Sequence, residues 1–271
     1  MTLRREGSAA SVEAILAARE GPARAFIPAA QVAALAGASG LASAREVALL
    51  ALPVAATLAR PSISAYRVGA VGVTEGGGLV LGGNLEFPGA SIHHTVHAEG
   101  FVTLHARARG LRVVELAIRQ ARPCAHCRQV LAEMAWAADL RIVDPLGSDV
   151  ALWDVYPVAF QPGDLEATGC VPGAVAWPGL APDPDGPALP HEVARALAHA
   201  GSLAHAPYSG EPAAIVVRVA DGRLFEGAVL ESVAFNPTIG PVQDALVALA
   251  AAGVPYAAVR EAWLATVGGA A

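Results

Sequence analysis

The spacing of apolar and polar positions predicts a helical start followed by an α/β region. Residues 8–59 are expected to be helical, and residues 66–82 to form a β-hairpin around the glycines at 76–78. Within the first region we expect helices over 11–20, just after Pro28, and from Ser43 or Ala44 to Leu58. Beyond the hairpin the pattern predicts a helix over 95–109, a strand over 113–118, a helix over 123–137 and a strand over 140–143. This order is typical of a mixed sheet with helices packed on it.

The second half of the chain repeats part of the first. When residue n is set against residue n + 145 without gaps, identical residues recur over the range 58–104, and Glu86 falls on Glu231. Identities at one offset over such a range indicate a duplication. Residues 161–190 are rich in Pro and Gly, which indicates a surface linker, and a helix is expected near His191. The predicted division is a helical N-terminal segment (1–44), a first unit (45–160), the linker (161–190) and a second unit (191–271).

Composition and charge narrow the class of protein. Apolar residues occupy 54% of the 271 positions and charged residues 15%, which indicates a compact globular protein. The formal net charge is −6 and no basic run exceeds Arg4-Arg5, so a nucleic-acid partner is disfavoured. No signal-peptide core is present, and the uncharged stretches 167–182 and 245–259 are too short to span a membrane and contain proline. Because there are only three cysteines, we expect a cytoplasmic protein without an internal disulfide.

Two short segments carry the residues that can do chemistry. They are His97-Ala98-Glu99 and Pro123-Cys124-Ala125-His126-Cys127, each at the start of a predicted helix. One imidazole (His97) and two thiolates (Cys124 and Cys127) form the three-ligand set of a catalytic zinc site, which keeps a fourth position for water. Helix N-termini carry partial positive charge, which stabilises thiolates. Glu99 is close enough to face that water as an acid or base without serving as a ligand.

Each half of this pattern has a simpler interpretation. A lone C-x-x-C is often a redox motif or half of a structural zinc site. A structural site needs a fourth Cys or His, and His126 lies between the two cysteines, where it is badly placed to complete the site. The joint pattern H-x-E…P-C-x-x-C is the signature of zinc-dependent nucleobase deaminases. In the second unit, Val242 and Asp244 replace His97 and Glu99 and no thiolate pair is present, so one zinc per chain is expected.

Further motifs extend the match beyond the metal ligands. They are Ser64-Ala65-Tyr66-Arg67-Val68-Gly69-Ala70, Gly83-Asn84-Leu85-Glu86-Phe87, the cysteine segment as far as Arg128-Gln129, Ala159-Phe160-Gln161-Pro162-Gly163-Asp164-Leu165 and Ala234-Phe235-Asn236-Pro237-Thr238. With these residues the chain resembles a cytidine deaminase of the long, two-domain, homodimeric type. The resemblance implies a three-layer α/β/α fold for each unit. It also implies zinc-dependent hydrolysis of cytidine and deoxycytidine to uridine, deoxyuridine and ammonia, a step of pyrimidine salvage.

The resemblance also implies roles for single residues. Asn84 and Glu86, with Leu85 between them, would bind the ribose 3′-hydroxyl. Tyr66 would pack near the pyrimidine and the Ala98 backbone would contact the base. In a homodimer, Phe160 and Ala234 would lie close to the neighbouring subunit's active site. The sequence departs from the family pattern at four positions: Tyr66 replaces a usual phenylalanine, Gly100 a glutamine, Ala125 a glycine and Ala121 an aromatic residue.

Other functions stay open at this point. The substrate could be another aminated nucleoside or heterocycle, or the chain could be a non-catalytic zinc-stabilised domain. Retention of Glu99 argues against the second alternative, because a structural zinc has no use for it. Asn84 and Glu86 could simply form a turn with a surface carboxylate. A nucleotide substrate is disfavoured because no arginine falls between Arg67 and Arg107.

Overall fold

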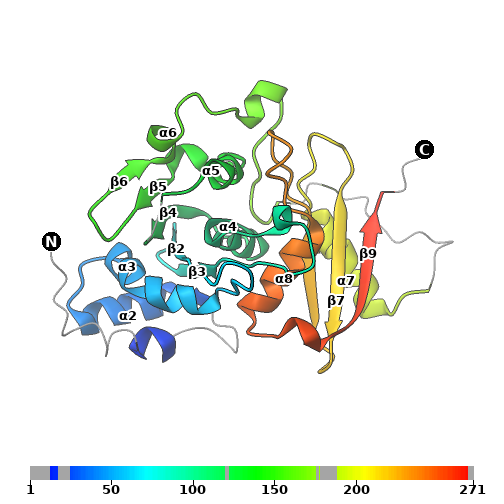
Figure 1. Ribbon diagram of the computed structural model, residues 1–271, viewed down its shortest axis with the longest axis horizontal. Helices are drawn as coiled ribbons and strands as arrows, with labels where there is room; N and C mark the ends of the chain where they lie inside the picture. Colours follow the sequence, from blue (N-terminus) through cyan, green and yellow to red (C-terminus); the bar gives the residue numbers. More distant parts are fainter. Residues whose placement is uncertain (1–12, 18–24, 120–121, 175–176, 178–187, 268–271) are drawn as a thin grey trace.

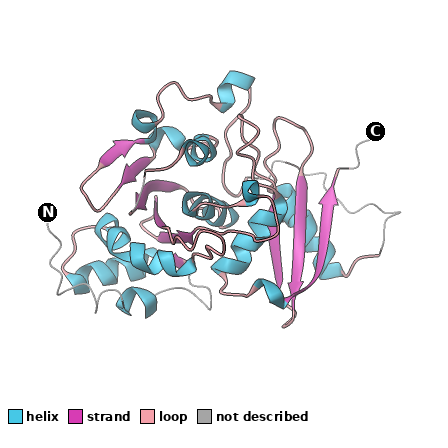
Figure 2. Ribbon diagram, viewed as in Figure 1, coloured by secondary structure: helices cyan, strands magenta, loops and turns pink. Residues whose placement is uncertain are grey.

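The computed structural model describes residues 13–17, 25–119, 122–174, 177 and 188–267. The departure at Ala121, much of the expected first helix and the later part of the linker lie outside these residues. Two α/β units stand side by side, with the first at the left of Figure 1 and the second at the right. Figure 2 shows the same arrangement by element type, with helices on both faces of each sheet.

The first unit is built on a six-stranded mixed sheet. Its strands, in spatial order, are β1 (Phe26–Ile27), β3 (Leu79–Gly83), β2 (Gly69–Thr74), β4 (Val113–Ile118), β5 (Arg141–Val143) and β6 (Asp149–Ala151). The pair β4–β5 is parallel and the other pairs are antiparallel, which confirms the predicted mixed sheet. Strand β1 corrects the expectation of a purely helical start. Two residues are too few to show an alternating pattern, and their pairing with Leu79 and Val80 is long-range.

Helices cover both faces of this sheet. On one face lie α2 (Ala29–Ser39) and α3 (Ala44–Ala55), and on the other lie α4 (Ala98–Ala108) and α5 (Ala125–Ala132). Successive side chains of a strand point to opposite faces, so Val71 packs with the α2–α3 layer and Ala70 with the α4–α5 layer. Helix α5 is shorter than predicted, and the rest of that range holds a turn and a 3₁₀ helix (Ala137–Asp139). The remaining short elements are a helical turn at 13–17, α6 (Leu152–Val155) and 3₁₀ helices at Ala56–Leu58, Ile92–His94, Pro162–Leu165 and Tyr256–Ala258.

Close packing at the end of β3 explains the glycine pair there. A Cβ on Gly82 would lie 2.7 Å from the carbonyl oxygen of Ala98, and one on Gly83 would lie 2.4 Å from the nitrogen of Ala59. Real Cβ atoms do not approach backbone atoms this closely. The missing side chain of Gly82 therefore lets the N-terminus of α4 sit directly against the sheet, next to the predicted site, and that of Gly83 lets the chain at Ala59 do so.

The second unit repeats the first in its strand register. Its sheet has the order β8 (Leu224–Ala228), β7 (Ala213–Val219), β9 (Val259–Thr266), with α7 (His191–Ser202) on one face and α8 (Pro241–Ala251) on the other. Ala214 pairs with Ala228 as Gly69 pairs with Gly83, at the same offset of 145. The irregularity between Val73 and Thr74 recurs between Arg218 and Val219. The helix expected near His191 and the duplication are both confirmed. These described strands are all antiparallel, and β9 takes the place of β4.

The two units share a core. Helices α4 and α8 pack against each other in the centre of Figure 1, and Leu230, Ile239 and Val247 join the core of the first unit. A buried ion pair crosses this interface: Arg107 donates to the Asp244 carboxylate at 2.7 Å and to the carbonyl oxygen of Ala228. Asp244 stands at the position of Glu99 in the repeat, so the second copy uses this acidic position for a contact between the units.

Within the described residues, no single helix is long and apolar enough to cross a membrane. The segments Ala29–Ser39 and Ala44–Leu58 have the length and composition of a membrane span only when they are taken together. The two segments are bent by 94° relative to each other.

Candidate active site

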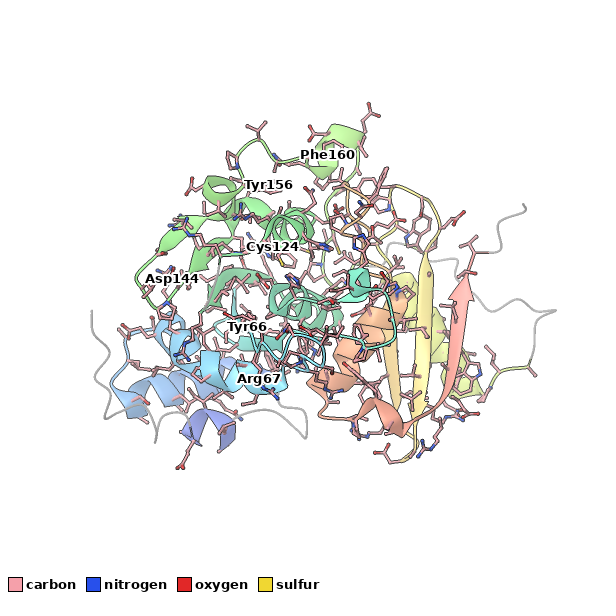
Figure 3. The ribbon with its side chains drawn as sticks, viewed as in Figure 1. Tyr66, Arg67, Cys124, Asp144, Tyr156 and Phe160 are labelled. Atoms are coloured by element: carbon pink, nitrogen blue, oxygen red, sulfur yellow. The ribbon has the colours of Figure 1, made fainter. Side chains whose placement is uncertain are left out.

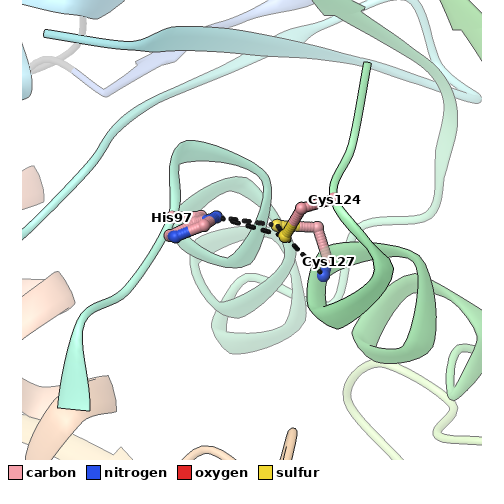
Figure 4. Close-up of side chains that lie close together, drawn as sticks. All are labelled: His97, Cys124 and Cys127. Carbon is pink, nitrogen blue, oxygen red and sulfur yellow. Dashed lines mark hydrogen bonds between the residues drawn. The ribbon is translucent and has the colours of Figure 1, made fainter. Parts of the chain in front are cut away.

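The three predicted metal ligands come together where two helices begin. His97 is the N-cap of α4, and Cys124 is the N-cap of α5 with Cys127 in the first turn. The Nδ1 atom of His97 lies 3.2 Å from Sγ of Cys127 and 3.5 Å from Sγ of Cys124, and the two sulfur atoms are 3.4 Å apart. Figure 4 shows the imidazole facing both sulfur atoms. Zinc–sulfur bonds of ~2.3 Å and zinc–nitrogen bonds of ~2.0 Å in a tetrahedron place the donor atoms roughly 3.5 Å apart. The donor set therefore fits zinc.

The electrostatics of the two thiols also favour a cation here. Hydrogen bonds with Cys127 and His97 lower the pKa of the Cys124 thiol to about 3, against the opposing effect of burial. Hydrogen bonding to Cys124, burial and the nearby Glu99 carboxylate raise the pKa of Cys127. One thiolate therefore forms easily and makes the second difficult to form. A divalent cation supplies the positive charge that stabilises both.

Glu99 is the buried carboxyl of the site. It lies in the first turn of α4 and is only 6% exposed. Burial raises its pKa above the ordinary value for glutamate, although the neighbouring His97 opposes the shift. A buried carboxyl with a raised pKa holds a proton more readily than an ordinary glutamate, which suits it to accept and return protons in acid–base catalysis.

A cavity of about 290 Å³ opens beside these residues. In Figure 3, Tyr66 and Cys124 lie in the middle of the first unit, whereas Phe160 lies at its outer edge. The predicted residues that line the cavity are Tyr66, Asn84, Glu86, His97, Ala98, Glu99 and Cys124. Ser64 and Val68 of the matched motif line it too, although neither was given a role, and the sequence did not point to Thr95, Ile118 and Arg122, which also line it. Leu85 is fully buried in the core and is not among the lining residues, and Cys127 is buried and does not line this cavity.

Comparisons with known proteins match both units. Two family models, each described as the cytidine and deoxycytidylate deaminase zinc-binding region, match residues 43–140 and 152–270. A cytidine deaminase of Klebsiella pneumoniae subsp. pneumoniae is 37% identical over 241 residues, covering 89% of this chain and 79% of that protein. A cytidine deaminase of Salmonella dublin is 36% identical over 248 residues, covering 91% of this chain and 81% of that protein. A solved cytidine deaminase from Burkholderia pseudomallei is 27% identical, with a TM-score of 0.39 over 42% of this chain and 98% of that chain. This chain belongs to the cytidine deaminase family.

Glu86 and Asn84 hold a loop of this cytidine deaminase as well as lining its cavity. The Glu86 carboxylate accepts hydrogen bonds from the backbone nitrogens of Ile63 (2.7 Å) and Ser64 (2.8 Å) and from the Ser64 hydroxyl. Burial alone would raise the pKa of Glu86, but these hydrogen bonds hold it below its ordinary value. The Asn84 side chain accepts from the nitrogen of Val68 (2.9 Å) and donates to the carbonyl oxygen of Tyr66 (3.0 Å).

The same loop contact recurs in the second unit, which has no zinc ligands. Glu231 accepts hydrogen bonds from the backbone nitrogens of Tyr208 (2.9 Å) and Ser209 (3.2 Å) and from the Ser209 hydroxyl. A carboxylate at this position therefore has a structural role in both copies. In the first unit the carboxylate also lines the cavity.

Arg122 is the charged lining residue that the sequence did not suggest. It is exposed, lies two residues before Cys124 and lines the cavity together with Glu86 and Glu99. Arg122 lies outside the range 67–107, whose lack of further arginines disfavoured a nucleotide substrate. Its position just before Pro123 was the sequence signal for a place at the site. A residue close in sequence to a metal ligand is held close to the metal site by the short chain between them.

Phe160 and Ala234 do not line this cavity. Phe160 is 42% exposed, and the Gln129 side chain donates a hydrogen bond to its carbonyl oxygen at 2.7 Å. Ala234 is half-buried, and its neighbour Phe235 is 63% exposed with a φ of 60°. Their contribution to a partner's site in this cytidine deaminase stays a prediction.

Proposed function

We propose that this chain deaminates cytidine and deoxycytidine by hydrolysis, giving uridine or deoxyuridine and ammonia, as a step of pyrimidine salvage. The observation that carries the proposal is the His97, Cys124 and Cys127 cluster beside the buried Glu99, at one cavity. A structural zinc site has no use for a buried carboxyl with a raised pKa at its edge. The similarity to cytidine deaminases over most of the chain supports the same function.

His97, Cys124 and Cys127 would hold one zinc ion per chain. A zinc ion held this way lowers the pKa of a bound water molecule toward neutrality and so provides the attacking nucleophile. Val242 and Asp244 occupy the corresponding positions of the second unit, and the only other cysteine of the chain is Cys170. A second site of this kind is therefore not expected.

Glu99 would carry the protons of the reaction. It delivers a proton to N3 of the pyrimidine, which makes C4 electrophilic toward water. The oxygen of the water adds to C4, and Glu99 then carries the proton of the new C4 hydroxyl to the amino group, so that the C4–N bond breaks and ammonia leaves. One carboxyl thus acts first as a base toward water and then as an acid toward the leaving group. Water is consumed and ammonia is released, so the atoms balance without a further reactant.

The direct test is the loss of cytidine absorbance on incubation with purified protein whose metal content has been measured. We expect one zinc per chain and turnover of cytidine and deoxycytidine, with slower turnover of free cytosine. Protein that contains zinc but does not turn over any pyrimidine nucleoside would favour the non-catalytic alternative. Turnover of a different aminated heterocycle in preference to cytidine would change the substrate assignment but keep the chemistry.

Arg122 favours a second candidate substrate, a cytidine or deoxycytidine 5′-monophosphate. Arg122 lines the catalytic cavity and also an adjacent cavity of about 210 Å³ that contains Arg119. That second cavity lies at the carboxyl ends of the parallel strands β4 and β5, where open α/β sheets commonly bind ligands. Arginine is well suited to phosphate. If the nucleotide is a substrate, Arg119→Ser should reduce its kcat/KM and leave that of deoxycytidine unchanged. No turnover of the nucleotide would remove this candidate.

We further propose a cytoplasmic, two-fold symmetric homodimer that binds neither nucleic acid nor membrane. Each active site would lie near the subunit interface, with Phe160 and Ala234 reaching toward the partner. Large apolar side chains are exposed on the single chain, including Ile92 (74%), Phe235 (63%) and Phe160 (42%). Exposed apolar groups of this kind favour association. Two-fold dimers are the commonest symmetric oligomers.

A further inference from the structure

Glu133 is a buried carboxyl with no part in the proposed chemistry. It follows the last residue of α5, and none of it is exposed. Its Oε1 atom accepts hydrogen bonds from Nε2 of His205 (2.7 Å) and from the Tyr208 hydroxyl (2.8 Å). Its Oε2 atom accepts one from the backbone nitrogen of Val233 (2.9 Å). All three partners belong to the second unit, so this carboxylate joins the two units. A buried carboxylate is stable only when such partners surround it.

The helix that Glu133 ends is also the helix that begins with the zinc ligands. Helix α5 has eight residues, with Cys124 as its N-cap and Cys127 in its first turn. A helix this short moves nearly as a rigid rod, so a restraint on one end sets the orientation of the other. Gln129 and Arg128 tie the middle of the helix to the first unit through the carbonyl oxygens of Phe160 and Val155. At its last turn, Glu133 ties it to the second unit.

Comparison of the two copies shows how the second unit came to provide this restraint. At the offset of 145, His205 and Tyr208 correspond to Arg60 and Ile63. In the first copy, the loop that follows Arg60 is held by Glu86 beside the substrate cavity. In the second copy, the corresponding loop is held by Glu231 in the same way, but its polar side chains point to Glu133. The backbone of the loop is held by a carboxylate in both copies, whereas its side chains bind Glu133 in the second copy.

We propose that Glu133 is a positioning residue through which the second unit sets the placement of Cys124 and Cys127. The inactive copy thereby contributes to the metal site without supplying a ligand. The inference rests on the proposed zinc site. Tyr208 also contacts the exposed Phe235 ring, at 6.2 Å between centroids, so the same network orients the turn that contains Ala234.

The test compares two tyrosine substitutions in the second unit. Tyr208→Phe removes one hydrogen bond to Glu133 without changing the shape of the side chain. Tyr256→Phe is the matched control, because the hydroxyl of Tyr256 is buried and has no hydrogen-bond partner within the described structure. Each variant is loaded with zinc or with cobalt. Zinc release to a chelator, the visible spectrum of the cobalt form, kcat and KM are then measured.

For Tyr208→Phe we expect zinc release to quicken and kcat to fall, each by up to about 10-fold, the lower end of what outer residues contribute to metal sites. The cobalt spectrum should shift while KM changes little. Tyr256→Phe should match the wild type, and Glu133→Gln should show the Tyr208→Phe effects more strongly. If Glu133→Gln does not fold, the tyrosine pair alone decides.

A lower melting temperature of Tyr208→Phe with an unchanged cobalt spectrum and unchanged zinc release would overturn the inference, because Glu133 would then only hold the units together. Equal effects of the two tyrosine substitutions would also overturn it. Failure of the proposed function gives a different result: the wild type itself would then bind no zinc or turn over no nucleoside.

Discussion

At the scale of single residues, the proposed chemistry depends on the buried carboxyl of Glu99. Glu99→Gln keeps the size of the side chain but cannot exchange a proton. We expect the variant to keep its zinc and its fold, since Glu99 is not a ligand, and to lose at least ~10²–10⁴ in kcat. The measurement is steady-state deamination of cytidine by protein with confirmed zinc content. Near-normal turnover in the zinc-loaded variant would contradict the proton-transfer role.

Glu86 has an observed role in holding its loop and a proposed role in binding the ribose, and one pair of variants can separate them. Glu86→Gln weakens both the loop contact and any contact with a sugar hydroxyl, whereas Glu231→Gln weakens only the equivalent loop contact in the second unit. We expect both to lower thermal stability, and only Glu86→Gln to raise KM for cytidine, by roughly 10-fold or more for a lost hydrogen bond to a charged group. Free cytosine should be little affected, because it has no ribose. Equal losses on cytidine and cytosine would show that Glu86 is structural.

At the scale of elements, α4 carries a histidine that makes its packing sensitive to pH. Burial, assisted by the nearby Arg109 charge, lowers the pKa of His105 to about 4. The unfolded chain takes up this proton near the ordinary value of ~6.5 and the folded chain does not until about pH 4. The free energy of unfolding should therefore fall as the pH is lowered from about 6.5 to 4.

Replacement of His105 by a side chain that does not titrate tests this expectation. His105→Gln should lower the free energy of unfolding at pH 7 and make it less dependent on pH between 6.5 and 4. Denaturant unfolding at several pH values measures both effects. An unchanged pH dependence in the variant would show that His105 does not titrate differently in the folded chain.

At the scale of the whole molecule, the shared-site proposal makes the active site a property of two chains. A Glu99→Gln chain and a Phe160→Ala chain are each expected to have low activity alone. After subunit exchange, some mixed dimers gain one site with an intact Glu99 and an intact partner Phe160. We therefore expect the activity of the mixture to exceed that of either parent. No recovery despite proven exchange, or a monomer in sedimentation at the working concentration, would rule out shared sites.

The sequence by itself determined the features that depend on local spacing. The strand of residues 113–118 and the hairpin follow from short-range patterns, and β4 spans the predicted residues. The metal ligands could be found for the same reason, because a ligand at a helix start is fixed by its own few neighbours. The constant offset of 145 revealed the duplication, and it recurs in the strand register and in the contacts of Glu86 and Glu231.

Only the tertiary structure decided which side chains meet across long separations in sequence. Arg107 pairs with Asp244, and Glu133 binds the nitrogen of Val233, although 137 and 100 residues separate these partners. No local pattern specifies such contacts, because they arise only when α4 packs against α8 and brings residues of the two units together. For the same reason, Leu85 is buried within the matched motif, and Arg122 reaches the cavity from outside the range where a charge was sought. The sequence contained the residues of the site, and the packing of helices and loops on the first sheet determined which of them line the cavity.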